Sequence, residues 1–190
     1  MSDREQYTPG PASGAQVKKD GEMWTLILVR ELRHSPEKVW RALTEPEHLR
    51  EWAPFDADKS LGTVGAKVKL TTVRAPTPKT SEITVMRADA PKVLEYNWGD
   101  ANTRWELEPF AGGTRLTLWH NLNRRFIAMG AAGWHICFDV LDRFLGGTPI
   151  GRMVGVEVMK FSGWHRLHAE YAKQFGVGTP KWPPQAAQEG

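Results

Sequence analysis

The chain has 190 residues, of which 41% are hydrophobic and 25% are charged, and its net charge is +3, as expected for one soluble globular domain. Its basic residues are scattered among acidic ones and no apolar run approaches the roughly 20 residues of a membrane helix, so neither a nucleic-acid partner nor a membrane span is expected. The single cysteine, Cys137, excludes an intrachain disulfide.

Both ends of the chain are predicted to be flexible tails. Residues 1–22 contain Pro, Gly, Ser and isolated charges without periodicity, and residues 177–190 are too rich in Gly and Pro for a helix. Residues 23–176 are left as the only domain. The N-terminus has no apolar core of a signal peptide, so we expect a cytoplasmic protein.

The most informative segment runs from Trp24 to Trp52. Its first part alternates as a strand does, with a high β-branched content. Ser35 and Pro36 then form a helix start, since serine caps free N–H groups and proline suits the first helical position. Thr44 and Pro46 repeat this signal, which predicts a second short helix.

Ten residues of this segment follow one another in the order Ser35, Pro36, Val39, Trp40, Ala42, Leu43, Thr44, Pro46, Leu49 and Trp52. This run resembles the START-like (SRPBCC) superfamily and, more closely, the family named after the activator of the 90-kilodalton heat-shock chaperone ATPase. The resemblance implies an α+β, helix-grip (START-like) fold. In that fold a curved antiparallel sheet wraps on a long C-terminal helix, and two short helices follow the first strand.

The middle of the chain is typical of an antiparallel meander, because apolar and polar residues alternate between turn signals. The expected strands are residues 64–73, 82–88, 92–98, 103–108 and 114–122.

Two helices are expected after the meander. Residues 128–145 carry one broad apolar stripe, and residues 161–175 resume the helical pattern. The Gly146-Gly147 pair breaks the pattern, so an inserted excursion should separate the two helical pieces.

The resemblance implies a cavity for an apolar small molecule between the sheet and the C-terminal helix. The candidate lining residues are Trp52, Phe55, Trp98, Trp105, Leu118, His120, Trp134, Phe138 and Leu141. The alternative is that these aromatic and aliphatic side chains simply fill the core, where aromatics supply much of the burial energy.

His120 is the most informative polar candidate. By alternation it shares the inward face with Leu116 and Leu118, and Thr114, Leu116 and His120 fit a Thr-x-Leu-x-x-x-His ending found in the family. A buried imidazole needs a partner or must stay neutral. Three roles are open: a structural histidine bonded to a carbonyl or water, a donor that orients a ligand, or a catalytic base.

Other chemical candidates carry less weight. His135 and Asp139 are spaced i,i+4 and are expected to form a surface pair. His165 and His168 lack a carboxylate at metal-ligand spacing, so no metal is expected. Cys137 on an apolar helix face is expected to be an inert small hydrophobe, although a Cys–His nucleophile with His120 is conceivable. No phosphate loop, dinucleotide fingerprint, GxSxG or HExxH motif suggests a cofactor.

These observations favour non-catalytic binding of a hydrophobic or amphipathic small molecule. Two alternatives stay open: a chaperone ATPase regulator, and a cyclase- or aromatase-like enzyme of the kind found in the superfamily. The identity of the ligand and the existence of a homodimer are left open by the sequence.

Overall fold

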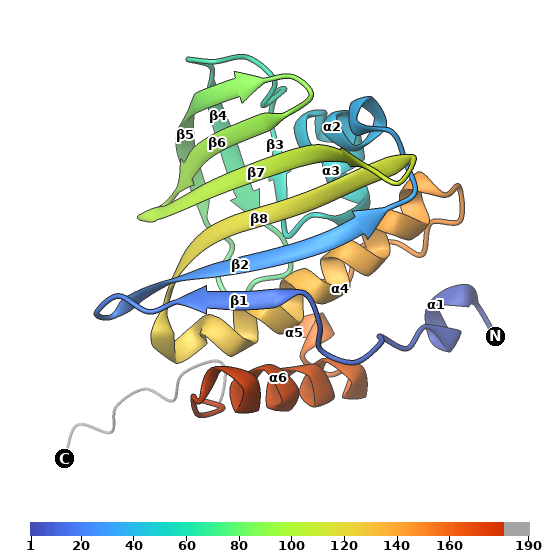
Figure 1. Cartoon of the computed structure of the whole chain (residues 1–190), viewed down its shortest axis with the longest axis vertical. Helices are drawn as coiled ribbons and strands as arrows, with labels where there is room; N and C mark the ends of the chain where they lie inside the picture. The colour runs from blue at the N-terminus through green and yellow to red at the C-terminus, as the bar shows by residue number, and fades with distance from the viewer. Residues whose placement is uncertain (181–190) are drawn as a thin grey trace.

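The computed structural model describes residues 1–180, which are built around one curved, eight-stranded antiparallel sheet (Figure 1). The order of strands across the sheet is β1-β2-β8-β7-β6-β5-β4-β3. In chain order the strands are β1 (Ala15–Lys18), β2 (Met23–Leu32), β3 (Phe55–Ala57), β4 (Lys67–Thr72), β5 (Thr80–Asp89), β6 (Val93–Trp98), β7 (Ala101–Phe110) and β8 (Gly113–Asn123). The predicted meander is confirmed, with differences only at the ends of its strands.

The two short helices after β2 are also present. They are α2 (Pro36–Thr44) and α3 (Pro46–Trp52). The Ser35 hydroxyl accepts a hydrogen bond from the Lys38 backbone N–H, as its capping position predicts. The predicted cap at Thr44 was wrong, because its hydroxyl donates to the Trp40 carbonyl one turn earlier instead.

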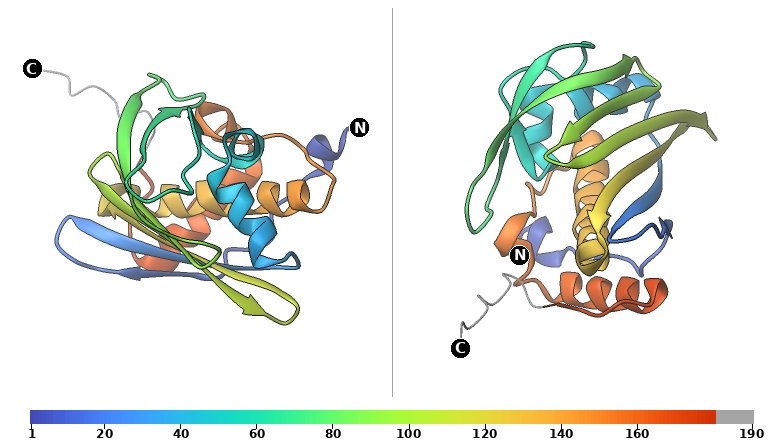
Figure 2. Two further views of the ribbon diagram at one scale, coloured as in Figure 1. Left: turned by 90° about the horizontal axis from the view of Figure 1, so that it is seen from above. Right: turned by 90° about the vertical axis from the view of Figure 1, so that its left-hand side faces the viewer.

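A 19-residue helix, α4 (Ile127–Leu145), follows the short 3-10 turn η1 (Arg124–Phe126) and lies in the concave side of the sheet. Figure 2 shows the sheet curving around α4, with α6 (Ser162–Phe175) along the other side of this helix. The expected excursion separates the two helices and contains the single turn α5 (Gly155–Val158). None of the helices between residues 1 and 180 has both the length and the apolar character needed to cross a bilayer.

The first 22 residues differ from the flexible tail expected there. They contain the short helix α1 (Asp3–Gln6), and β1 pairs with β2 at the edge of the sheet. Tyr7 is buried. This segment is held by individual hydrogen bonds, such as Val29 N–H to the Gly14 carbonyl at 2.8 Å, which leave no periodic pattern in the sequence. Of the expected C-terminal tail, residues 181–190 lie outside the described residues.

Five polar residues join α4 to its neighbours, and we call them the Asp139 cluster: Tyr7, Arg30, His135, Asp139 and Tyr171. The Asp139 carboxylate accepts hydrogen bonds from the Tyr7 hydroxyl and the Arg30 guanidinium. The His135 Nδ1 lies 2.7 Å from the Tyr171 hydroxyl, and His135 is only 3% exposed. The His135 Nε2 lies 3.8 Å from the Asp139 carboxylate, so the predicted pair is present, but its expected place on the surface was wrong, because the N-terminal segment and α6 cover this side of α4.

The Asp139 cluster generates a test of stability. Replacing Asp139 with Ala should lower the free energy of unfolding by about 2–4 kcal/mol, because Arg30 and Tyr7 would lose their acceptor in a largely buried place. Asp142→Ala is the matched control on the same helix. Asp142 is 53% exposed and forms an exposed pair with His34, so its loss should cost less than about 1 kcal/mol. Equal losses in urea unfolding of the two variants would contradict this role of Asp139.

Candidate functional site

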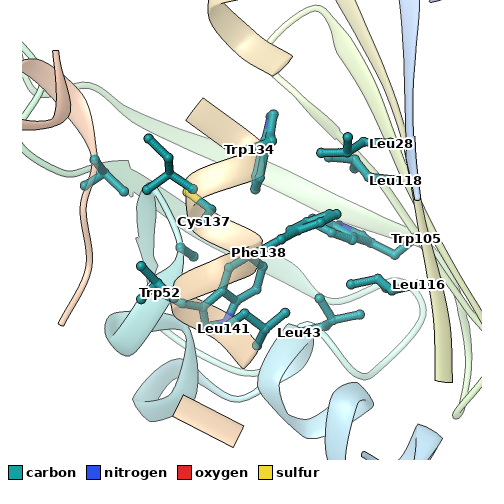
Figure 3. Close-up of a cluster of buried hydrophobic side chains, with 14 of the residues drawn as sticks. Leu28, Leu43, Trp52, Trp105, Leu116, Leu118, Trp134, Cys137, Phe138 and Leu141 are labelled. Carbon is teal, nitrogen blue, oxygen red and sulfur yellow. The ribbon is translucent and has the colours of Figure 1, made fainter. Parts of the chain in front are cut away.

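Six of the nine predicted lining residues pack in the centre of the core. They are Trp52, Phe55, Trp105, Leu118, Phe138 and Leu141, and each is 0–1% exposed. Figure 3 shows five of them, all but Phe55, filling the space between α4 and the sheet. The Trp52 and Trp105 indoles stand edge to face at 5.9 Å. Their N–H groups donate to the Ala42 carbonyl and the Tyr96 hydroxyl, so neither needs a ligand.

The remaining three, Trp98, His120 and Trp134, line a pocket of about 210 Å³ that opens to solvent. It lies where the first turns of α4 meet the ends of β6 and β8. The structure adds nine lining residues to these three: Pro54, Leu122, Gly130, Gly133, Cys137, Met153, Val154, Gly155 and Val158. The space between sheet and helix is thus filled at its centre and open at one end.

His120 is the lining residue with a defined polar contact. Its Nδ1 lies 3.0 Å from the hydroxyl of Thr103, the residue opposite it on β7. The ring stacks on Trp98 at 6.2 Å and meets the edge of Trp134 at 5.9 Å. Burial lowers the pKa of His120 to about 4, with the Asn102 backbone opposing the shift. The imidazole is therefore neutral at pH 7.

The lining residues that the structure describes include no Asp, Glu, Lys or Arg. Cys137 lies on the pocket face of α4, and burial raises the pKa of its thiol to about 12. This agrees with the prediction that Cys137 is inert, since a thiol with so high a pKa is a poor nucleophile. Within residues 1–180, no three His, Cys, Asp or Glu side chains lie close enough together to hold a metal ion.

Two glycines give α4 its pocket face, and our reading of the sequence missed them. A Cβ at Gly130 would meet the end of the Leu122 side chain at 2.4 Å, whereas a Cβ at Gly133 would meet nothing within 4 Å. Glycine weakens a helix interior by roughly 1 kcal/mol relative to alanine, and at Gly133 the fold leaves room for alanine. Two glycines three residues apart inside an otherwise regular helical pattern could have indicated a pocket on this face of the helix.

The excursion contributes Met153, Val154, Gly155 and Val158 to the lining of the pocket, and we call residues 150–158 the wall segment. Arg152 is buried and donates to the Asp56 carboxylate at 2.7 Å and to the Arg50 carbonyl. The Arg152 carbonyl in turn accepts from Arg4 and Arg74. Gly155 has a φ of +64°, and a Cβ there would stand 2.1 Å from the Arg74 carbonyl oxygen, so only glycine permits this approach.

Comparison of the chain with known proteins identifies a matching family. The family model described as activator of Hsp90 ATPase homolog 1-like protein matches residues 33–146. Among curated proteins, none matches the chain.

Three solved structures are similar in fold. EF2215 from Enterococcus faecalis, a conserved protein of unknown function, has 18% identity and a TM-score of 0.61 over 85% of this chain and 90% of its own. CalU16 from Micromonospora echinospora has 18% identity and a TM-score of 0.58, over 86% and 92%. MLL2253 from Mesorhizobium loti has 25% identity and a TM-score of 0.55, over 66% and 99%. These similarities, with the curved sheet around α4, confirm the helix-grip fold.

The neutral His120 predicts how stability depends on pH. Its pKa in the fold, about 4, lies below the ordinary value of about 6.5, so between these values the unfolded chain binds a proton that the folded chain does not. Its contribution to stability is therefore complete above pH 6.5 and is lost as the pH falls toward 4. Each such group adds a slope of up to about 1.4 kcal/mol per pH unit in this window.

The variant His120→Gln does not titrate and should lose less stability between pH 7 and pH 5 than the unmodified protein does. Urea unfolding at pH 7, 6 and 5 measures this difference. His135, whose pKa burial also lowers to about 4, contributes equally to both proteins. The same loss of stability in both would show that His120 is not held neutral by the fold.

Proposed function

The chain belongs to the activator of Hsp90 ATPase homolog 1-like family, and from that premise we propose that it binds an apolar small molecule, without catalysis, in the pocket at the start of α4. Proteins with the fold of this family commonly bind ligands. The pocket has the usual form of such a site, since its lining is mostly apolar and has one well-placed polar side chain.

The observation that carries this proposal is the open space beside Gly133. The centre of the same interface is packed without room for a ligand, so the sheet and helix are able to fill the space between them. At Gly133 they do not, although an alanine would fit and would favour the helix. A pocket kept open at a cost in helix stability is the expected mark of a site used for binding.

A cyclase-like activity has less support at this pocket. His120 and Cys137 are its titratable lining residues, and burial keeps both neutral at pH 7. Neither has a neighbouring charged side chain in the lining to activate it.

Substitution of Gly133 should separate stability from binding. Gly133→Ala should raise the melting temperature by about 2–4 °C, because helix propensity improves by roughly 1 kcal/mol, and should weaken binding of the neutral bicyclic hydrocarbon indane several-fold. Gly133→Leu should abolish indane binding by filling the pocket. Thermal unfolding and isothermal titration calorimetry measure the two effects.

Asp142→Ala, on the exposed face of the same helix, is the control and should bind indane as the unmodified protein does. If Gly133→Leu binds indane as tightly as the unmodified protein does, the binding site for indane is not this pocket.

The matched family model favours regulation of a chaperone ATPase as a second candidate, because the family is named for an activator of Hsp90. The test is to add the protein to Hsp90 and measure ATP hydrolysis. If this role is independent of the pocket, Gly133→Leu should stimulate hydrolysis as well as the unmodified protein does. No change in hydrolysis with either protein would remove this candidate.

A further inference from the structure

The size and lining of the pocket indicate which chemical class of ligand it would take, an inference that rests on the proposed binding function. Its volume of about 210 Å³ exceeds the roughly 150 Å³ of a cavity that takes up benzene, so one or two fused rings fit. The space is lined by the indoles of Trp98 and Trp134 and by the side chains of Met153, Val154 and Val158. Aromatic and thioether groups of this kind make favourable contacts with the rings of a ligand.

Electrostatics in the pocket select against charged ligands. The described lining offers neither a cation for a carboxylate nor an anion for an ammonium group. His120 is neutral and provides no counter-charge at pH 7. Removing an unpaired charge from water is costly, so an ionised ligand is excluded from the inner part of the pocket.

The hydrogen bond between His120 and Thr103 decides which polar group the ligand carries. Thr103 is 1% exposed, and the only hydrogen bond of its hydroxyl within the described residues is to the His120 Nδ1. If Nδ1 carried the ring proton, the Thr103 hydroxyl proton would be a buried donor without an acceptor, which is the more costly arrangement. The favoured arrangement has the hydroxyl donating to Nδ1 and the proton of the neutral ring on Nε2, and the Asn102 backbone, which opposes the lowering of the pKa of His120, is the competing acceptor for the ring proton.

We propose that the site takes an uncharged, one- or two-ring aromatic molecule with a hydrogen-bond acceptor, such as a ketone or ether oxygen, placed on the Nε2–H of His120. His120 fixes the orientation of the ligand, and the two tryptophans with the wall segment hold its rings. Thr103 acts through His120 by setting its tautomer.

Three probes of nearly equal size test this chemistry in the unmodified protein. They are indane, which has no polar group, 1-indanone, which has only an acceptor, and indole, which has an N–H donor. One net hydrogen bond should make 1-indanone bind about 3- to 10-fold more tightly than indane, and indole should not share this gain. Indane-1-carboxylate should not bind at pH 7.

Two further measurements assign the effect to His120. Nitrogen-15 NMR of the imidazole should show the proton on Nε2 at pH 7. In His120→Phe, the affinity for 1-indanone should fall to that for indane, and continued indane binding by the same variant shows that the pocket is still formed.

The outcomes separate this inference from the function on which it rests. Equal binding of indane and 1-indanone, a preference for indole or the carboxylate, or a proton on Nδ1 would overturn the inferred ligand chemistry while leaving apolar binding in place. If none of the three neutral probes binds, both the inference and the proposed function are wrong.

Discussion

Helix α4 is enclosed on most of its sides, and this enclosure determines which residues the helix can contain and where a pocket can form. The sheet covers one side of the helix, and α6 with the N-terminal segment covers another, so nearly every residue of α4 must be apolar or have a fixed partner. Asp139 shows how the second condition is met. Its carboxylate lies between the Arg30 guanidinium of β2 and the Tyr7 hydroxyl, so one side chain joins the helix to the sheet and to the N-terminal segment. The pocket exists only where this enclosure is incomplete, beside the glycines in the first turns of the helix.

The fold was largely predictable from the sequence, whereas the pocket was only partly so. Alternation in residues 114–122 and the cap at Ser35 are local signals, and local signals identify strands and helix starts well. Nothing local distinguishes Trp105 from Trp98, since both are inward aromatics on neighbouring strands. The two differ in their position across the curved sheet. Trp105 packs against the middle of α4, whereas Trp98 lines the pocket at the start of this helix.

The N-terminal segment and the wall segment were harder to predict for a related reason. Both are held by hydrogen bonds between arginine side chains and backbone carbonyls that lie far away in the chain. Arg4, for example, donates to the carbonyls of Ile150 and Arg152, more than 140 positions along. Such contacts carry no periodicity, so the first 22 residues resemble a flexible tail in sequence although they contain α1 and β1 and place Tyr7 against Asp139 of α4.

The position of the wall segment has a consequence for how such proteins diverge. Residues of α4 contact the sheet, α6 and the pocket at once, so a substitution in α4 affects packing throughout the core. Met153, Val154 and Val158 contribute to the pocket from a segment that follows the last residue, 146, matched by the family model. Arginine side chains and the close approach of Gly155 to Arg74 fix the backbone of this segment through contacts that do not involve its apolar side chains. In the proposed function, the shape of the pocket can therefore be altered by substitution of these three side chains alone, all of which lie outside the segment that the family model matches.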